Sequence, residues 1–216
     1  IVGVHYYQNY AQAMEVVEDI EKLGGRAYAL GADLRKENDL SHLVERAIME
    51  CGRLDGAVNT VHGAFPQISI RDMVWDDWQL HIEALRIHFE LCKAVLPQMR
   101  AQKYGRIVFL SGGLAYRYYN GCAAFSTIKA GLNAFCKCLA REEGENNITV
   151  NIVAPGRVET ADHIMQLKDD ELHKCSLKRF ASPKDVADTV LYFLSPLSDG
   201  VSGHTIYVSG GEIMPV

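Results

Sequence analysis

Lys129 lies one helical turn after Phe125 in a segment whose apolar residues repeat at helical spacing. Other side chains able to transfer protons occur earlier in the chain, namely His62, Tyr116 and Tyr118. A histidine near its ordinary pKa is an effective general acid, and a tyrosine hydroxyl can serve the same purpose. Proton transfer is therefore the first chemistry that these residue types suggest.

The cysteines and histidines form no metal-binding pattern, because neither C-x-x-C nor H-x-x-x-H occurs in the sequence. Cys136 and Cys138 are two residues apart within a helical pattern, so their side chains point in different directions. We expect no metal site and interpret the cysteines as reduced, partly buried thiols of a cytoplasmic protein. The six are Cys51, Cys92, Cys122, Cys136, Cys138 and Cys175.

The composition predicts one globular domain over residues 1–216. A chain of 216 residues with 48% hydrophobic residues and 6 prolines is long enough for one well-buried core and short for two. The net charge of −5 argues against a nucleic-acid surface. No apolar stretch has the length that a membrane span needs, and no signal peptide is apparent. We therefore expect a small molecule or another protein as the partner.

Short β-rich runs alternate with longer amphipathic runs along the chain. This alternation predicts an α/β fold with a doubly wound parallel sheet. The apolar run Ile107–Leu110 suits a strand covered on both faces, and Gly24-Gly25 ends the first helix. The predicted strands are Ile1–Tyr7, Ala27–Gly31, Gly56–Thr60, Arg106–Ser111, Thr149–Ala154 and Thr205–Val208. The predicted helices are Ala11–Leu23, Leu40–Cys51, Trp75–Met99, Ala124–Glu143 and Lys184–Leu194.

Six short landmarks follow one another along nearly the whole chain. They are Ala32-Asp33-Leu34, Gly52-Arg53-Leu54-Asp55 leading to Asn59, the Lys129 helix, Asn151–Gly156, Val201-Ser202-Gly203 and Gly210-Gly211. Each landmark alone is a weak signal, but their order and spacing together are specific. In this order they resemble the short-chain dehydrogenase/reductase family. The resemblance implies a Rossmann-type, three-layer αβα fold and an NAD(P)(H)-dependent carbonyl oxidoreductase.

The beginning of the chain departs from the family pattern. Family members open with a strand and a glycine-rich turn that holds the pyrophosphate, whereas this chain opens on His5-Tyr6-Tyr7, similar to the family's second strand. The resemblance places the absent strand in the middle of the sheet, so we expect unpaired strand edges there. Roughly 30 residues, one strand-turn-helix unit, are expected before Ile1. The alternative is a natural short form with a rearranged sheet.

The end of the opening strand bears on the choice of cofactor. Family members that use NAD place an acidic residue there, and those that use NADP supply a cation for the 2′-phosphate. Tyr6-Tyr7-Gln8-Asn9 contains neither, and resembles the His-Tyr-x-Arg-Ser strand end of pteridine-reductase-like members with Gln8 in place of the arginine. Because no carboxylate would repel the phosphate, NADP(H) is favoured over NAD(H).

The resemblance also assigns the rest of a dinucleotide site. Asp33 and Leu34 would flank the adenine, Asn59 would lie under the adenosine, and Lys129 would hold the nicotinamide ribose. For Asp33 and Thr160 a turn or capping role is the alternative. The remaining cofactor positions are Pro155 and Gly156, with Val158 and Thr160 meeting the carboxamide and phosphates.

Three of the four catalytic positions of the family have lost their functional groups. Phe125 replaces the tyrosine that transfers the proton, and Gly112 falls where a serine polarises the carbonyl. Leu85 is aligned with the asparagine of the proton relay, and only Lys129 matches. The loop Asn59–Gly63 also differs from the family's Asn-Asn-Ala-Gly. Losing a positioned acid costs about 10²–10⁴ in rate, so ordinary ketoreductase turnover is not expected.

Neighbouring residues offer substitutes for the lost groups. His62, Tyr116 and Tyr118 could deliver a proton from a new direction. The alternative is that the loop tyrosines shape a substrate site or an interface. His81 and His88, seven residues apart on one helical face, are interpreted as packing or interface residues.

Three hypotheses follow from these residues. The first is an oxidoreductase with relocated acid-base groups, acting on a carbonyl or an activated double bond. The second is a pseudoenzyme that keeps the fold and a pocket for a dinucleotide or small molecule. The third is a structural partner of an active relative, docking through Trp75–Met99 and Ala124–Glu143. The resemblance implies a homodimer or homotetramer through the same two helices.

Overall fold

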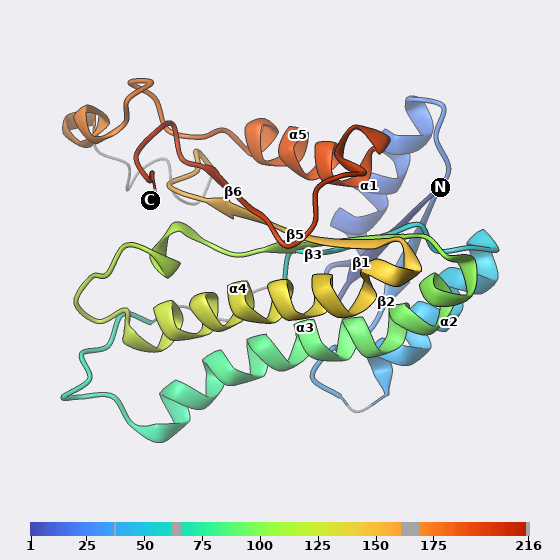
Figure 1. Cartoon of the computed structure of the whole chain (residues 1–216), viewed down its shortest axis with the longest axis horizontal. Helices are drawn as coiled ribbons and strands as arrows, with labels where there is room; N and C mark the ends of the chain where they lie inside the picture. The colour runs from blue at the N-terminus through green and yellow to red at the C-terminus, as the bar shows by residue number, and fades with distance from the viewer. Residues whose placement is uncertain (37, 62–65, 161–168, 215–216) are drawn as a thin grey trace.

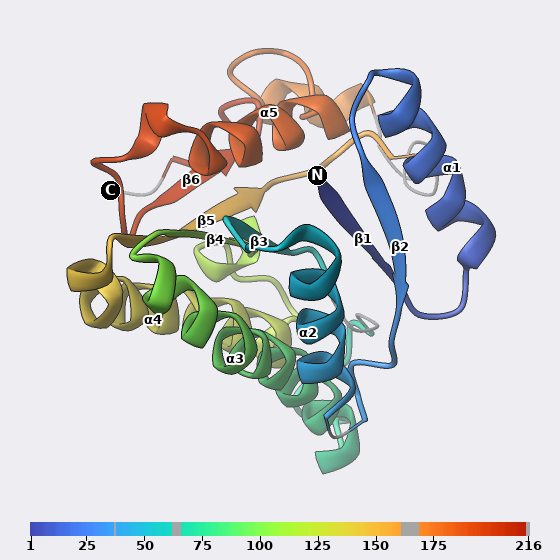
Figure 2. The ribbon, with the colours of Figure 1, turned by 90° about the vertical axis from the view of Figure 1, so that its right-hand side faces the viewer.

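The computed structural model describes residues 1–36, 38–61, 66–160 and 169–214. A layer of parallel strands lies between two layers of helices, as the sequence predicts (Figure 1). Figure 2 shows α1 and α5 over one face of the strands and α2, α3 and α4 over the other. The helices are α1 (Tyr10–Lys22), α2 (Asp39–Cys51), α3 (Trp75–Gln102), α4 (Ala123–Glu143) and α5 (Pro183–Leu194).

Each described strand pairs in parallel with its neighbour. The bounds lie close to the expected ones, although the predicted ends Thr60 and Ser111 fall outside the strands. Helix α3 runs three residues past the expected Met99, to Gln102, and ends where Lys103 takes a left-handed backbone with φ of 54°. The strands are β1 (Val2–Tyr6), β2 (Ala27–Gly31), β3 (Gly56–Asn59), β4 (Gly105–Leu110), β5 (Ile148–Pro155) and β6 (Thr205–Val208).

The strands form two separate sheets. One has the order β1-β2 and the other the order β3-β4-β5-β6. Among the described residues, β1 has no partner on the side toward β3, and β3 has none on the side toward β1 (Figure 2). Val2 and Val58 on these two strands are exposed. This arrangement agrees with the expectation of unpaired strand edges in the middle of the sheet.

The core lies on both faces of the larger sheet. Ile107 and Phe109 of β4 pack toward α2, α3 and α4, while Val108 packs with Phe193 of α5. Because successive strand residues point to opposite faces, burial of all three requires helices on both sides. The carboxyl ends of β3 to β6 meet at one edge of the sheet, the edge at which open α/β sheets bind ligands. Within the described part of the chain, no helix combines the length and apolarity of a membrane span.

Candidate functional site

Lys129 is buried on α4, one turn after Phe125. Its Nζ donates a hydrogen bond to the Leu110 carbonyl at 3.1 Å and lies 5.3 Å from the centroid of the Phe125 ring. Lys129 forms no ion pair with a described carboxylate, and its burial lowers the pKa of the amine to about 8. The site therefore holds a desolvated amine that lacks an anionic partner among the described residues.

Gly112 lies beside Phe125 at the end of β4. Its backbone is extended, and a Cβ built there would lie 3.8 Å from Phe125 Cε1, an ordinary van der Waals distance. The structure thus brings together Gly112, Phe125 and Lys129, which the sequence placed in one site. Neither Gly112 nor Phe125 carries a group that can transfer a proton.

A cavity of about 20 Å³ borders Lys129 and Phe125, which is room for about one water molecule. Helix α3 contributes His81, Ala84 and His88 to its lining. Leu85 does not line this cavity, and its Cδ2 would instead lie 3.9 Å from a Cβ at Gly131. The residue of α3 that faces the lysine between the two histidines is therefore Ala84. The other lining residues are Val61, Ile128 and Leu132.

His88 is part of a buried polar connection between α3 and β3. The Asn59 amide donates to His88 Nδ1 at 2.9 Å, which leaves the proton on Nε2, and Asn59 Oδ1 accepts from the Val61 backbone at 2.9 Å. Burial lowers the pKa of His88 to about 3. The expected packing role of His88 thus includes a specific hydrogen bond. Its partner is 29 residues away, and no local sequence signal marks it.

His81 lies against the residue that replaces the family's tyrosine. Its ring meets the Phe125 ring edge-on, with centroids 6.1 Å apart. Burial lowers the pKa of His81, so the imidazole is neutral at pH 7. The two histidines therefore border one small cavity from α3 while Phe125 and Lys129 border it from α4.

The expected cofactor positions after β5 lie in tightly packed backbone. The Gly156 N–H donates to the Val208 carbonyl at 2.9 Å, and a Cβ at Gly156 would lie only 2.7 Å from Ser209 Cβ. Pro155 ends β5 directly before it, and Val158 forms a parallel bridge with Ala181. Thr160 Oγ1 is buried and has no hydrogen-bond partner among the described residues. An unpaired buried hydroxyl suits contact with a polar ligand.

Asp33 and Leu34 follow β2 and differ in their surroundings. Leu34 is partly buried against the main core. The Asp33 carboxylate accepts hydrogen bonds from the Arg35 backbone at 3.2 Å and from Arg35 Nε at 2.8 Å. The Arg35 guanidinium holds the pKa of Asp33 below its ordinary value. The Asp33 carboxylate therefore caps a backbone N–H of its turn and forms an ion pair with Arg35 that the sequence did not suggest.

Tyr116 and Tyr118, two of the expected proton-donor substitutes, do not line the cavity beside Lys129. The Tyr116 ring packs edge-on against Tyr207 of β6, with centroids 5.3 Å apart. Tyr118 is 78% exposed. Neither tyrosine belongs to the lining of the cavity beside Lys129. His62 lies outside the described residues, and the described ones contain no cluster of histidine, cysteine and acidic side chains suited to a metal.

A buried ion-pair cluster joins three loops near this edge of the sheet. The Glu212 side chain is only 3% exposed, and its Oε1 lies 2.5 Å from Arg117 Nη1 and 3.6 Å from Arg157 Nη2. Arg117 follows β4, Arg157 follows β5, and Glu212 follows β6. Sequence reasoning missed this cluster because its members are separated by 40 or more positions and form no motif.

Comparisons with known proteins agree with this geometry. A sequence model described as enoyl-(acyl carrier protein) reductase matches residues 2–212. The chain is 31% identical to a 3-oxoacyl-(acyl carrier protein) reductase of Staphylococcus epidermidis, over 99% of this chain and 88% of that one. It is 30% identical to a 7α-hydroxysteroid dehydrogenase of Escherichia coli, over 95% and 82% of the two chains. The crystal structure of an acetoin dehydrogenase from Enterobacter cloacae superposes with a TM-score of 0.87 at 27% identity, covering 97% of this chain and 84% of that one.

Proposed function

Because this chain belongs to the short-chain dehydrogenase/reductase family, we propose that it is a divergent member that binds a nicotinamide dinucleotide, preferably NADP(H), without ordinary ketoreductase turnover. The observation that carries the proposal is the site around Lys129. The lysine is kept, while the neighbouring positions hold Phe125, Gly112 and Ala84. The site therefore keeps a cation for a ligand and lacks the hydroxyls that move a proton.

The size of the lost contributions supports binding without turnover. A positioned general acid contributes about 10²–10⁴ in rate, and one oxyanion donor contributes about 10²–10³. Phe125 removes the first contribution and Gly112 removes the second. Together these losses would leave little of the rate by which a relative reduces a carbonyl.

The described residues fit the nicotinamide half of a dinucleotide. Lys129 has no carboxylate partner among the described residues, and Thr160 Oγ1 is buried without a hydrogen bond there. Both groups would be satisfied by polar atoms of a ligand, Lys129 by ribose hydroxyls and Thr160 by a phosphate or carboxamide. When bound, the cofactor would supply the hydride. Residues 1–216 contain no G-x-x-x-G-x-G turn for the pyrophosphate, so the fit proposed here concerns the nicotinamide half alone.

A thermal shift with NADPH tests the proposal. A ligand at 100 times its dissociation constant stabilises the folded protein by about 2.7 kcal/mol, which gives a measurable rise in Tm. We expect a rise for the wild type and a smaller one for Lys129→Met, which keeps the length of the side chain and removes its donors. Absence of a shift for the wild type at millimolar NADPH would refute cofactor binding.

A second candidate function is an oxidoreductase with a relocated proton-transfer group. The observation in its favour is His81, which borders the same cavity as Lys129 and contacts the Phe125 ring. A neutral imidazole there could exchange a proton with a small carbonyl or activated alkene. Substrate-dependent NADPH oxidation that disappears in His81→Gln would favour this candidate. Absence of turnover in the wild type would favour the pseudoenzyme.

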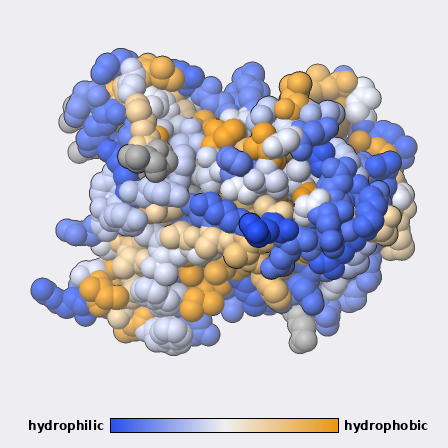
Figure 3. Space-filling model, in the orientation of Figure 1, coloured by the Kyte–Doolittle hydropathy of each residue, from blue (hydrophilic) through white to orange (hydrophobic). Residues whose placement is uncertain are grey.

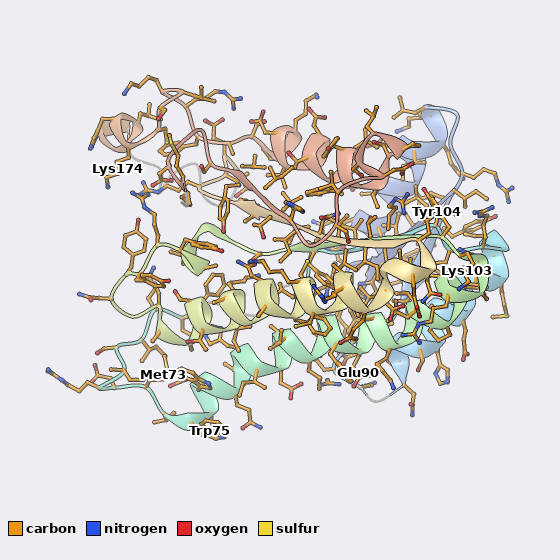
Figure 4. The ribbon with its side chains drawn as sticks, in the orientation of Figure 1. Met73, Trp75, Glu90, Lys103, Tyr104 and Lys174 are labelled. Atoms are coloured by element: carbon orange, nitrogen blue, oxygen red, sulfur yellow. The ribbon has the colours of Figure 1, made fainter. Side chains whose placement is uncertain are left out.

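Self-association through α3 and α4 is a further part of the proposal. Trp75, Ile82 and Phe89 of α3 are exposed, and Figures 3 and 4 show apolar surface and the Trp75 side chain where this helix begins. Exposed apolar groups of this kind favour a homodimer or homotetramer, or a complex with an active relative. Light scattering of the wild type and Phe89→Asp would separate a monomer from these assemblies. The six free cysteines favour a reducing, cytoplasmic location.

A further inference from the structure

An arginine from the loop after β2 reaches the end of β1. Strands β1 and β2 pair in parallel with Tyr6 opposite Gly31, so both end at the same edge of the sheet. The Arg35 guanidinium carbon lies 4.6 Å from the centroid of the Tyr7 ring, and its Nη2 donates to the Tyr7 hydroxyl. The four residues Tyr6 to Asn9 contain no cation of their own, but the fold supplies one from 28 residues away.

The position of Arg35 is held from several directions. Its Nε donates to Asp33 Oδ1 at 2.8 Å and its Nη2 donates to Asp33 Oδ2 at 3.0 Å, in a two-point contact. The Arg35 carbonyl accepts from Arg86 Nη2 of α3 at 3.0 Å. The Asp33 N–H donates to Asp39 Oδ2 at the start of α2. Asp33 and Tyr7 thus orient the guanidinium, while α2 and α3 hold the backbone of its loop.

One face of the guanidinium remains open to solvent. The Arg35 side chain is 62% exposed, whereas that of Asp33 is 15% exposed. Nη1 of Arg35 donates to no atom of the described residues, so its two N–H groups are available to a ligand. Lys36 adds a second positive charge beside the pair, while Arg86 is balanced by Glu83. Asp33 and Asp39 offset the charges of Arg35 and Lys36, so the exposed guanidinium N–H groups, and not a net positive charge, would attract an anion here.

We propose that Arg35, placed on the Tyr7 ring, is the specificity-determining residue that recognises the 2′-phosphate of NADP(H). In a Rossmann fold the adenosine ribose lies at the end of the strand that β1 represents, and an arginine there accommodates the phosphate. A guanidinium binds phosphate oxygens through paired N–H groups and stacks on aromatic rings. Because Asp33 is neutralised by Arg35, its carboxylate does not repel the phosphate. The inference rests on the proposed dinucleotide function.

Calorimetric titration with two small nucleotides isolates the 2′-phosphate from the rest of the cofactor. The full chain is titrated with adenosine 2′,5′-bisphosphate and with adenosine 5′-monophosphate, and NADPH and NADH are compared in the same way. We expect the wild type to bind the bisphosphate about tenfold more tightly than the monophosphate, and NADPH about tenfold more tightly than NADH. Arg35→Gln should lose this preference. An unchanged preference in Arg35→Gln overturns the inference.

Two further variants separate the arginine from its neighbours. Lys36→Gln removes the same charge one residue away and should keep most of the preference. Arg35→Gln frees the Asp33 carboxylate, which would itself repel phosphate, so Asp33→Asn combined with Arg35→Gln removes that repulsion. The double variant should still lack the preference. If the double variant instead regained the preference for 2′-phosphorylated ligands, the loss in Arg35→Gln would come from the freed Asp33 carboxylate. That result would overturn the inference.

Failure of the inference is distinguishable from failure of the proposed function. Equal binding of NADPH and NADH by the wild type would leave cofactor binding intact and overturn the role of Arg35. An Arg35-dependent preference for the bisphosphate, in a protein that does not bind NADPH, would uphold Arg35 and overturn the proposed function. Absence of binding by all four ligands would overturn both.

Discussion

The Lys129 ammonium lies 5.3 Å from the centroid of the Phe125 ring, so the basic half of the family's Tyr-x-x-x-Lys pair faces an aromatic ring without a hydroxyl. This contact is a cation–π interaction in a desolvated site. It keeps the lysine oriented toward the end of β4, where the amine also donates to the Leu110 carbonyl. The lysine of the pair is thus present at this position, while the tyrosine hydroxyl is absent.

Restoring the hydroxyls tests whether the pocket is otherwise intact. A Cβ at Gly112 would lie 3.8 Å from Phe125 Cε1, so Phe125→Tyr with Gly112→Ser introduces no backbone clash. We expect this double variant to reduce a small ketone at least about tenfold faster than the wild type, since one acid alone contributes about 10²–10⁴. NADPH oxidation, followed by its absorbance, gives the rate.

Adding Lys129→Met to that double variant should remove the gain. If NADPH binds and the double variant stays inactive, the missing relay asparagine is the next position to restore. Ala84→Asn is then the variant to add, because Ala84 and not Leu85 lines the cavity. Equal activity with and without Lys129 would contradict the assigned role of the lysine.

The buried amine of Lys129 should make stability depend on alkaline pH. Its folded pKa is lowered to about 8, from an ordinary value of 10.5. Between these values the unfolded chain binds more protons, so this group's contribution to stability rises with pH, by about 3 kcal/mol in all. Urea unfolding of the wild type and Lys129→Met across this alkaline range measures how much less the unfolding free energy of the variant changes with pH.

The pH dependence of the unfolding free energy must be compared between the wild type and Lys129→Met, because buried Cys92 and Cys136 change stability in the opposite direction. Burial raises the pKa of both thiols to about 12, so their contribution to stability falls as the unfolded thiols ionise. Both proteins share this loss. A wild-type curve parallel to that of Lys129→Met would show that the amine is not desolvated.

His88 should make the fold sensitive to acid. Burial lowers its pKa to about 3, so between pH 3 and about 6.5 the unfolded chain binds a proton that the folded chain does not. The stability contributed by neutral His88 is complete above about pH 6.5 and is lost as the pH falls toward 3. We expect His88→Gln to have a weaker dependence on pH in this acidic range, measured by urea unfolding.

The same variant tests the hydrogen bond to Asn59. The amide oxygen introduced by His88→Gln can act as acceptor, whereas His88→Leu leaves the Asn59 amide without its partner. A buried unsatisfied group costs about 1–3 kcal/mol, so the leucine variant should be the less stable of the two at pH 7. Equal stability of the two variants would argue against the hydrogen bond.

Glu212 should hold the C-terminal turn against the loops after β4 and β5. Glu212→Gln keeps the shape of the side chain but removes the negative charge that Arg117 and Arg157 share. We expect a loss of about 1–3 kcal/mol in unfolding free energy, because the charge-assisted hydrogen bond to a buried carboxylate is weakened while both arginines stay partly exposed. Thermal unfolding and limited proteolysis of the C-terminal segment measure the effect.

A surface pair provides the matched control for Glu212. Lys184 and Asp188 form an exposed ion pair one turn apart on α5. Exposed pairs contribute little, so Asp188→Asn should leave Tm nearly unchanged. A similar loss in both variants would mean that general charge, and not the buried cluster, accounts for the effect of Glu212→Gln.

The periodicity of apolar residues along the sequence predicted much of the fold. Apolar residues at helical spacing predicted α1 to α5, and the run Ile107–Leu110 predicted a strand buried on both faces. These predictions succeeded because the burial of a helix or strand depends on the period of its own residues. The spacing of Phe125 and Lys129 likewise placed both on one helical face. The bounds moved by up to three residues because helix and strand ends depend on capping and pairing.

By itself, the sequence determined the α/β class, the family resemblance and the loss of hydroxyls beside Lys129. Only the tertiary structure decided that Ala84 lines the cavity, that Asn59 bonds His88 and that Arg35 reaches Tyr7. Parallel pairing joins strands through long crossovers, so the side chains that meet at a sheet edge come from distant parts of the chain. Helical periodicity constrains which face of α3 is buried, but a one-residue choice between Ala84 and Leu85 depends on packing against α4. Spacing along a chain specifies neighbours within an element, whereas packing specifies neighbours between elements.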